Sequence, residues 1–223
     1  VILPVFNEGK IILDVLKKNI KVFEGSDLNI TEIIVVDDCS KDNSLKQVKK
    51  FMAQYKGAIN IRIIKHKQNM GKSEAMKTGL AATDSEYILL TDSDTYFEKN
   101  ALKRIFVDMQ GHSAIVGHIA PYEQNTLAQM QAIEYDFDQR ILRNTQSAYN
   151  NPISIPGPFY VVRKDFLEKI DFTDSIVEDF KIGVELNRHS KKIAISGAKA
   201  YTHPPLDLKT LRKQRLRWFG GIL

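Results

Sequence analysis

The sequence is poor in cysteine and has no long apolar segment. Cys39 is the single cysteine among 223 residues, so no internal disulfide can form, and a reducing compartment fits this composition. No apolar run reaches the length of a transmembrane helix. The chain nevertheless starts at Val1 inside one apolar run and ends inside another, 219–223. We therefore expect a fragment of a longer membrane protein.

A strong charge of one sign and compositional bias are also missing. The formal net charge is +5, which is too small to indicate a nucleic-acid partner, and no nucleic-acid-binding motif is present. Hydrophobic residues at 43% and charged residues at 26% are typical of a folded domain, and no internal repeat occurs. The small positive excess suits anionic phosphates or an anionic membrane surface.

Strand-like and helix-like patterns alternate through the first part of the chain. Apolar runs predict strands at 1–6, 32–36, 59–65 and 86–90, and helical spacing predicts helices at 9–23, 41–55 and 71–82. Ser40 is expected to cap the second of these helices. This alternation predicts an α/β fold with a mainly parallel sheet, flanked by helices and connected by right-handed crossovers.

The pattern is less regular after Asn100. It predicts helices at 101–109, 124–145, 177–188 and 207–218, and strands at 113–119, 154–163 and 192–196. Pro156-Gly157-Pro158 interrupts the strand-like segment 154–163. No linker divides the chain, so we expect a single domain over 1–223.

Acidic residues follow three of the predicted strands. Glu8 follows the first, Asp37 and Asp38 end the second, and Asp92 and Asp94 follow the fourth. Ligands bind beyond the carboxyl ends of the strands in an open parallel sheet, so these acids should converge on one crevice. Carboxylates held close together repel each other unless a cation neutralises them, and a divalent metal is therefore the simplest explanation of Asp92 and Asp94.

The spacing of Asp92 and Asp94 agrees with a metal site. Residues i and i+2 of an extended segment project to the same side, so both carboxylates can face a ligand while Ser93 faces away. The alternative is a turn in which the two acids cap nearby N–H groups. An isolated Asp-x-Asp would favour the turn, but a strand end opposite Asp37 and Asp38 favours the metal site.

Six short motifs carry a family resemblance. They are Pro4–Glu8, Val35–Asp42, Asn69–Lys72, Asp92–Asp94, Val177–Asp179 and Gln214–Trp218. In this order, and over nearly the whole chain, they resemble family 2 glycosyltransferases with the GT-A fold, a mixed and mainly parallel sheet flanked by helices. The last two motifs resemble the membrane-bound branch that includes cellulose, chitin, hyaluronan and poly-N-acetylglucosamine synthases. The resemblance implies a catalytic domain on the cytoplasmic side of a membrane.

The resemblance assigns the nucleotide to the first half of the chain. The residues expected to hold the nucleoside of a nucleotide-sugar donor, usually uridine, are Pro4, Asn7, Glu8, Asp37 and Asp38. About 1–100 would therefore bind the donor, and about 101–223 would bind the acceptor.

The resemblance also assigns the reacting groups. Lys72 would approach the nucleotide phosphates, although a solvated lysine at a helix start is an equal alternative. Asp92 would face the sugar-nucleotide, and Asp94 would be the main ligand of Mg²⁺ or Mn²⁺. Asp179 would be the general base that deprotonates the acceptor, with Glu178 beside it. The alternative for this acidic pair is a favourable interaction with the start of a helix.

The last motif lies on a predicted basic amphipathic helix. Gln214, Arg217 and Trp218 share one face at positions i, i+3 and i+4. The resemblance implies that Arg217 pairs with a diphosphate and that Trp218 stacks against an acceptor sugar. A helix lying on a membrane surface is the alternative, and both roles are compatible.

Two positions depart from the family pattern. Val177 replaces the threonine of a Thr-Glu-Asp motif, and only Gly157 remains where these synthases often carry Phe-Phe-Cys-Gly-Ser. The second departure concerns the acceptor. Cys39, His118 and His203 belong to no metal-ligand cluster in the sequence and are expected to be structural.

The resemblance implies an inverting transfer of a sugar from a nucleotide-sugar, in the first place a UDP-sugar, to a growing polysaccharide. One alternative is the transfer of a single sugar to a lipid acceptor of the ceramide or polyprenyl-phosphate type. Another alternative is a nucleotide-binding protein without catalysis. Asp179 argues against the last alternative, because a binding module needs no general base.

Overall fold

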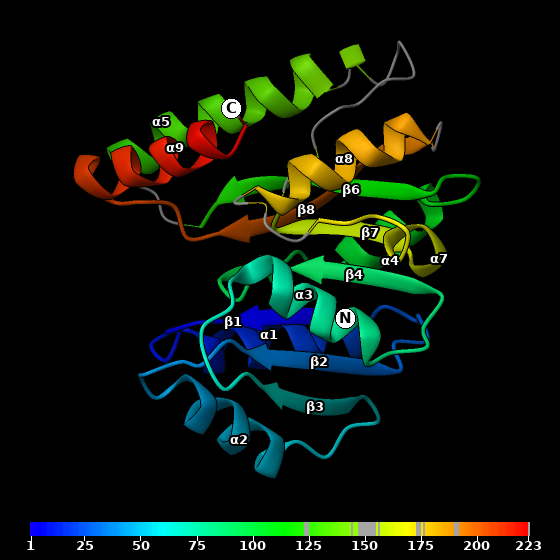
Figure 1. Ribbon diagram of the computed structural model, residues 1–223, viewed down its shortest axis with the longest axis vertical. Coiled ribbons are helices and arrows are strands. Elements are labelled where there is room, and N and C mark those ends of the chain that lie inside the picture. The colour runs from blue at the N-terminus through cyan, green and yellow to red at the C-terminus, as the bar shows by residue number, and fades with distance from the viewer. Residues whose placement is uncertain are drawn as a thin grey trace.

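The computed structural model describes residues 1–122, 125–143, 145–146, 155, 157–172, 175, 177–189 and 192–222. Within these residues the strands form one sheet in the order β3-β2-β1-β4-β7-β6-β8-β5, with helices on both of its faces (Figure 1). The strands are β1 Ile2–Val5, β2 Glu32–Asp37, β3 Asn60–Lys65, β4 Tyr87–Thr91, β5 Thr95–Phe97, β6 Ala114–Pro121, β7 Phe159–Arg163 and β8 Ile193–Thr202.

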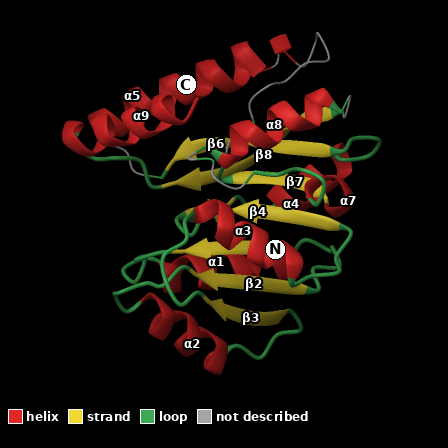
Figure 2. Cartoon of the chain, viewed as in Figure 1, coloured by secondary structure: helices red, strands yellow, loops and turns green. Residues whose placement is uncertain are grey.

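Helices connect these strands and cover the sheet (Figure 2). They are α1 Ile12–Glu24, α2 Ser44–Gln54, α3 Lys72–Ala81, α4 Ala101–Asp108, α5 Thr126–Phe137, α7 Lys164–Leu167, α8 Glu178–Arg188 and α9 Leu208–Ile222, together with a π-helix, η1 Asp138–Arg143. The pairs β1–β2, β2–β3, β1–β4 and β6–β8 are parallel, whereas β4–β7, β6–β7 and β5–β8 are antiparallel. The expected α/β fold with a mixed, mainly parallel sheet is confirmed.

The alternation of side chains along each strand builds two apolar layers. Leu3 and Val5 face a core that also contains side chains of α1, α2 and α4. Ile2, one residue away, faces the opposite core, which contains side chains of α3 and α8. Successive side chains of a strand point to opposite faces of the sheet, so a continuous apolar run is required when both faces are covered. This is why β1 and β2 are apolar at nearly every position.

Several predicted boundaries are wrong. The helix predicted at 41–55 begins at Ser44 with Asn43 as its N-cap residue, so Ser40 does not cap it. The strand predicted at 192–196 continues to Thr202, because it pairs with β6 along its length and with β5 at its end. The sequence pattern also missed the short strand β5 and the short helix α7. Residues 154 and 156 of the strand predicted at 154–163 lie outside the described residues, and so do residues 151–153, which precede it.

The helix predicted at 124–145 changes its winding partway along. Its first residue, Gln124, lies outside the described residues, α5 covers Thr126–Phe137, and the chain continues as η1. The side chain of Gln139 explains the position of this change. It accepts a hydrogen bond from the N–H of Ile119 at 2.6 Å and donates one to the C=O of Ile119 at 2.8 Å. Within the described residues β6 pairs with β7 only as far as Val116, and at Ile119 the glutamine amide takes the place of that neighbouring strand.

Asn19 on α1 fixes the chain directly after the predicted metal motif. Its side-chain amide donates to the C=O of Thr95 at 2.8 Å and accepts from the N–H of Phe97 at 3.1 Å. Asn19 is buried, and satisfied polar groups in an interior are costly to displace. Strand β5 is therefore held between β8 on one side and α1 on the other, and it positions Asp94, the residue before Thr95.

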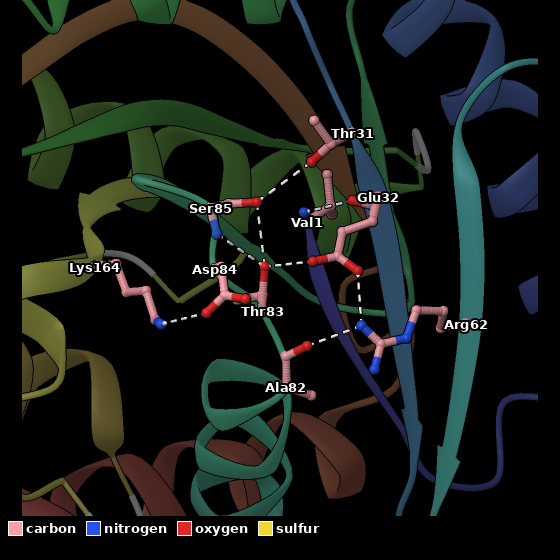
Figure 3. A network of polar contacts seen from close by, with 9 residues as sticks. All are labelled: Val1, Thr31, Glu32, Arg62, Ala82, Thr83, Asp84, Ser85 and Lys164. Carbon is pink, nitrogen blue, oxygen red and sulfur yellow. Dashed lines mark hydrogen bonds and ion pairs between the residues drawn. The ribbon is translucent and has the colours of Figure 1, made fainter.

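A polar network ties α3 and β4 to the edge of the sheet that lies opposite the strand ends with the acidic residues (Figure 3). The carboxylate of Glu32 accepts hydrogen bonds from Thr83 and, at 3.0 Å, from Arg62. Arg62 also donates to the C=O of Ala82 at 2.8 Å, just beyond the end of α3. The C-terminal end of α3 is thus fixed to β2 and β3. This constraint matters because the N-terminal end of α3 enters the candidate site.

Helices α5 and α9 lie side by side at one end of the molecule (Figure 1). An ion pair between Arg215 on α9 and Glu134 on α5, at 2.5 Å, joins them. None of the helices within the described residues is long and apolar enough to cross a membrane.

Candidate active site

The loops that follow β1 and β2 are joined to each other. Hydrogen bonds connect Asn7 N to Ser40 Oγ at 3.1 Å, Lys41 N to Asn7 Oδ1 at 2.8 Å, Glu8 N to Ser44 Oγ at 2.7 Å and Gly9 N to Asp42 Oδ2 at 2.9 Å. Asn7 adopts a φ of 58°, a left-handed conformation that asparagine tolerates better than most residues. The predicted nucleoside-binding motifs at 4–8 and 35–42 therefore form one continuous surface.

Asp38 and Asp37 differ in how their oxygens are used. The Asp38 carboxylate is buried and accepts hydrogen bonds at 2.8 Å from the N–H groups of Met70 and Gly71, while His66 lies 2.8 Å from it. Asp37 is equally buried, and its Oδ1 accepts from Ser40 N at 3.3 Å. Its Oδ2 has no hydrogen-bond partner in the described part of the chain. Asp37 thus retains an unused acceptor at the end of β2, whereas Asp38 holds the turn before α3.

Pro4 occupies the centre of the sheet rather than a loop. It is buried in β1 and aligned with Val36 of β2. Proline has no N–H to donate, and β1 pairs with β4 at Ile2 and Leu90, close to the carboxyl end of β4. The rest of β1 extends beyond this pairing, toward the edge where the crevice of an α/β sheet is expected.

The Asp-x-Asp motif lies in a turn. Strand β4 ends at Thr91, and the N–H of Thr95 donates to the C=O of Asp92 at 3.2 Å before β5 begins. The expectation of an extended segment at Asp92 and Asp94 is therefore wrong, because the chain must reverse between β4 and β5. The two carboxylates are nevertheless close, since the charge of Asp92 acts on Asp94.

Of the three acidic groups expected to converge, those that follow β1 and β4 interact through their charges, whereas Asp37 and Asp38 do not contribute to the pKa values of Glu8 and Asp94. Burial, followed by the charge of Asp92, raises the pKa of Asp94 to about 6, against the hydrogen bond from Thr202 and the charges of Lys72 and His203. Burial and the charges of Asp94, Asp42 and Asp92 raise the pKa of Glu8 to about 7. Carboxylates with raised pKa values in one crevice favour a bound cation.

Lys72 joins this acidic group to a second one. Its Nζ lies 2.5 Å from Asp92 Oδ1 and 2.7 Å from Glu178 Oε1. Burial lowers the pKa of Lys72, but the charges of Asp92, Glu178 and Asp179 outweigh burial and raise it, so the ammonium stays charged. Neither sequence-based interpretation of Lys72 included this role. The lysine connects the end of β4 to the start of α8.

The next residue of α3 strengthens the connection. Ser73 Oγ donates to the C=O of Ser175 at 2.8 Å, just before α8 begins. The N–H groups of Met70 and Gly71, which precede α3, are held by Asp38. The N-terminal end of α3 is consequently fixed to the nucleoside-side loop on one flank and to α8 on the other.

Asp179 stands at the start of α8 beside this connection. Burial and the charge of Glu178 raise its pKa to about 6, while Lys72 and a hydrogen bond from Phe180 N, at 2.8 Å, act in the opposite direction. Gly157 faces this carboxylate: a Cβ added there would lie 2.8 Å from Asp179 Oδ2 and 3.3 Å from Lys72 Nζ. A side chain at position 157 would therefore require the carboxylate of Asp179 to move.

Tyr160 adds a buried hydroxyl that the sequence did not single out. It lies on β7, is 1% exposed, and its hydroxyl has no hydrogen-bond partner among the described residues. Burial, together with the charge of Glu178, raises its pKa, and the charges of Asp179 and Asp92 act in the same direction. A tyrosine inside an apolar strand gives no local signal of function, because β7 is apolar on both faces.

The side chains of the motif at 214–218 lie in two different environments. Gln214 and Arg217 line an open groove of about 430 Å³ together with His203, Pro204, Pro205, Thr210 and Lys213. Trp218 is not among the lining residues; the guanidinium of Arg215 lies over its ring at 4.3 Å. His203, expected to be structural, both lines this groove and acts on the pKa of Asp94. The predicted early end of β8 hid this proximity.

The carboxylates of Asp92 and Asp94 suit a divalent cation whose remaining ligands come from a bound substrate. Within the described ranges, no group of three or more His, Cys, Asp and Glu side chains is arranged to hold a metal ion. Magnesium is usually held by one or two carboxylates together with substrate phosphates. Asp92 and Asp94 supply such a pair, and burial followed by the charge of Asp92 raises the pKa of Asp94, an effect that a bound cation would oppose.

The shared position of Lys72 predicts a loss of stability in Lys72→Met. This substitution leaves the Glu178 carboxylate, which is 6% exposed, close to Asp179 and without its cation. We expect the free energy of unfolding to fall by about 1–3 kcal/mol, less than for a fully buried pair because Lys72 is partly exposed. Urea unfolding followed by circular dichroism measures this. Lys77→Met, on the exposed side of α3, is the matched control, and equal midpoints for the two variants would contradict the assignment.

Comparison with known proteins agrees with the geometry. The family model described as "Glycosyl transferase family 2" matches residues 1–171. Over 227 residues the chain is 24% identical to a poly-beta-1,6-N-acetyl-D-glucosamine synthase of Staphylococcus epidermidis, covering 99% of this chain and 53% of that protein. It is 26% identical over 236 residues to a hyaluronan synthase of Streptococcus pyogenes, covering 97% of this chain and 55% of that protein. The chain thus spans about half of the length of these relatives.

Solved structures share the fold. The mannosyltransferase PcManGT from Pyrobaculum calidifontis, in complex with GDP-Man and Mn²⁺, superposes with a TM-score of 0.73 at 15% identity, covering 99% of this chain and 60% of that one. S. aureus TarS in complex with UDP-GlcNAc gives a TM-score of 0.66 at 20% identity, covering 92% of this chain and 58% of that one. With a family model that matches most of its length, the chain belongs to glycosyl transferase family 2.

Proposed function

We propose that this chain transfers a sugar, with inversion, from a UDP-sugar to a growing polysaccharide. One observation carries the proposal. Lys72 bridges Asp92, from the predicted nucleotide-binding half, and Glu178, the neighbour of the proposed base Asp179. A carboxylate pair suited to a metal–diphosphate and a buried carboxylate suited to proton abstraction therefore meet at one ammonium group. The division of a single domain 1–223 into a donor half and an acceptor half is part of the proposal.

The donor is assigned to the loops that follow β1 and β2. Asn7, Glu8, Asp37 and Asp38, with Pro4 preceding them, are proposed to hold the nucleoside. The unused Oδ2 of Asp37 supports this assignment, because a buried acceptor without a partner is costly unless a ligand N–H reaches it. Complexes of the structural neighbours with GDP-Man and with UDP-GlcNAc support a nucleotide-sugar as the donor.

A divalent cation, Mg²⁺ or Mn²⁺, is proposed as the cofactor. Asp94 would be its main ligand and Asp92 the second, with the donor diphosphate completing the set. Such a cation would offset the negative charge that develops on the leaving diphosphate. The Mn²⁺ present in the complex of the mannosyltransferase neighbour supports this assignment.

Asp179 is proposed as the general base. Its raised pKa, about 6, leaves it ionised near neutral pH while increasing its affinity for a proton. The acceptor hydroxyl loses its proton to Asp179 and attacks the anomeric carbon from the face opposite the diphosphate, which gives inversion. Lys72 is proposed to lie near the phosphates when the donor binds, since its ammonium already contacts Asp92.

The acceptor is assigned to the groove beside α9. Gln214 and Arg217 line it, and Arg217 is proposed to pair with the diphosphate. Trp218 is proposed to support an acceptor sugar, for which its ring would have to exchange part of its contact with Arg215. Polysaccharide synthases among the relatives favour a growing polysaccharide over a lipid acceptor.

Contact with a membrane is proposed for the surface formed by α5, η1 and α9. Large apolar side chains are exposed on these elements: Met130, Ile133, Phe137 and Ile141 on α5 and η1, and Leu208, Leu216 and Phe219 on α9. Exposed basic residues Lys209, Arg212 and Lys213 accompany them. Apolar and basic side chains on neighbouring helices suit an anionic membrane surface. The single cysteine and the nucleotide-sugar donor suit the cytoplasmic side.

Metal removal should abolish activity. In excess chelator we expect sugar transfer to vanish, and we expect it to return when magnesium or manganese is added, because without a cation the carboxylates of Asp92 and Asp94 would repel the diphosphate. Asp94→Ala should weaken binding of the nucleotide-sugar in calorimetry when metal is present and change it little when metal is absent. Full activity of the wild-type protein in chelator would exclude this role.

Loss of the base should slow catalysis without weakening donor binding. Asp179→Asn keeps the shape of the side chain but cannot accept the proton, so we expect the rate to fall by about a hundred- to ten-thousand-fold. In the wild type, kcat/KM should decline as the pH falls through about 6, where Asp179 becomes protonated. Calorimetry with UDP should give nearly equal affinities for both proteins. A near-native rate in Asp179→Asn would refute the assignment.

Membrane association can be tested by fractionation. The full-length protein should sediment with membranes and should remain there in high salt, because apolar side chains and not charges alone make the contact. Immunoblotting of the pellet and the supernatant after a salt wash measures this. Complete release by salt would show a purely electrostatic attachment and would contradict the proposal.

A further inference from the structure

A buried histidine that belongs to none of the six sequence motifs lies directly after β3, beside the loop that follows β2. His66 is 8% exposed, and its main-chain N–H donates to the C=O of Asp37 at 2.9 Å. Its ring Nδ1 lies 2.8 Å from Asp38 Oδ1, and its ring Nε2 lies 2.9 Å from Thr78 Oγ1 on α3. His66 therefore contacts both acids at the end of β2 and joins them to α3.

The partners of the ring determine which nitrogen carries the hydrogen. A carboxylate only accepts hydrogen bonds, so Nδ1 donates to Asp38, and in the neutral ring Nε2 then accepts from the hydroxyl of Thr78. Both nitrogens are used inside the fold, and neither is left to contact a substrate. Any effect of His66 on a substrate must therefore act through Asp38 or through α3.

The bond from His66 fixes the orientation of the Asp38 carboxylate. Oδ1 accepts from His66 and from the N–H of Met70, and Oδ2 accepts from the N–H of Gly71, each at 2.8 Å. The two oxygens of a carboxylate offer about four acceptor positions. One position, on Oδ2, therefore remains for a ligand, and the carboxylate cannot rotate without breaking the bonds that hold it.

The same carboxylate holds one side of the turn before α3. Gly71 has a φ of 90°, a conformation that favours glycine, and its N–H is one of the two that Asp38 binds. On the other side of the turn, ion pairs with Asp92 and Glu178 hold Lys72. The contact with His66 thus acts on the side of the turn that faces the loop after β2, while the ion pairs hold Lys72 independently.

Resting on the proposed function, we infer that His66 is a positioning residue of the donor site. It donates to Asp38 and thereby holds the remaining acceptor position of this carboxylate in the direction of the donor nucleoside. The neighbouring Asp37 has its own open acceptor, Oδ2, for which the described residues supply no partner. Both acceptors suit a nucleoside, which carries an N–H group on its base and O–H groups on its ribose.

The test separates the two nitrogens of the ring. In His66→Asn the side-chain amide takes the place of Nδ1 and still donates to Asp38, but it is too short to reach Thr78. In His66→Gln the longer amide takes the place of Nε2 and still contacts Thr78, but the donor to Asp38 is lost. The matched control is His112→Gln, the same substitution at a histidine that lines a groove at the start of β4, whereas Asp92 follows the end of that strand.

Three quantities are measured for the full-length protein: the affinity for UDP by calorimetry with Mg²⁺ present, kcat and KM for the nucleotide-sugar, and the thermal unfolding midpoint. We expect His66→Gln to weaken UDP binding by about tenfold, as for the loss of a hydrogen bond to a charged group. The KM for the nucleotide-sugar should rise more than kcat falls, because Lys72 keeps its own ion pairs.

The conservative variant should restore binding but not stability. We expect His66→Asn to bind UDP within about threefold of the wild type, because the donor to Asp38 is retained. Both variants should lower the unfolding midpoint, since each loses one buried hydrogen bond of His66. His112→Gln should match the wild type in UDP affinity, KM and kcat.

Equal UDP affinity in His66→Gln and the wild type would overturn the inference. An equal loss of affinity in His66→Asn and His66→Gln would overturn it as well, because the packing of the ring and not the bond to Asp38 would then be responsible. If the wild type binds neither UDP nor GDP, the donor assignment of the proposed function fails and the inference fails with it. That result differs from the first two, in which the wild type binds the nucleotide.

Should His66→Gln fail to fold, nitrogen NMR of the wild type with labelled histidine takes its place. The signal of His66 is the one that indicates a hydrogen on Nδ1 and that disappears in His66→Asn. UDP should shift this signal, because the nucleotide and the ring share the Asp38 carboxylate. A signal that UDP leaves unchanged would overturn the inference.

Discussion

The ammonium of Lys72 lies between carboxylates that come from distant parts of the chain, Asp92 at the end of β4 and Glu178 at the start of α8. Without this cation, the acids gathered at the strand ends would repel each other across the crevice. The same charge lowers the proton affinity of Asp179 and Asp94. A single lysine therefore links the two acidic groups of the site and opposes the rise in pKa that burial causes in Asp179 and Asp94.

Helix α3, which carries Lys72, is held in place at both of its ends. Arg62 binds the C=O of Ala82 beyond its C-terminal end (Figure 3). Asp38 holds the N–H groups of Met70 and Gly71 before its N-terminal end. Asp38 belongs to the predicted nucleoside-binding loop. A donor that shifts this loop would shift α3 and, through Lys72 and Ser73, the start of α8. Hydrogen bonds and an ion pair thus connect the loop proposed to bind the donor with the start of the helix that carries the proposed base.

Local patterns were sufficient to predict the elements with strong periodicity. Strands β1 and β2 are apolar because both of their faces are covered, and α1 and α8 carry apolar residues at helical spacing, so each is recognisable in the sequence alone. The alternation of strands and helices predicted the α/β fold, short motifs in a fixed order predicted the family, and both are confirmed. The convergence of Glu8 with Asp92 and Asp94 could also be anticipated, because parallel strands end at one edge of the sheet.

Features that depend on contacts between distant residues could not be predicted. The turn at Asp92–Asp94 and strand β5 exist because Asn19 and β8 bind the segment that follows. The π-helix depends on Gln139 and the main chain of Ile119. The contact of Lys72 with Glu178 could not be anticipated, because nothing near Lys72 in the sequence indicates it. The role of Gly157 emerged only from its distance to Asp179. The roles assigned to individual site residues remain predictions.

The measurement that tests the account most directly is the size of the product made by the full-length protein in membranes. The membranes are incubated with a panel of radiolabelled nucleotide-sugars, with divalent metal present, and the product is sized by gel filtration before and after glycosidase treatment. The account predicts that one UDP-sugar yields a polymer far longer than a single addition. Label that appears only as one sugar on an extractable lipid, with every donor in the panel, would contradict it.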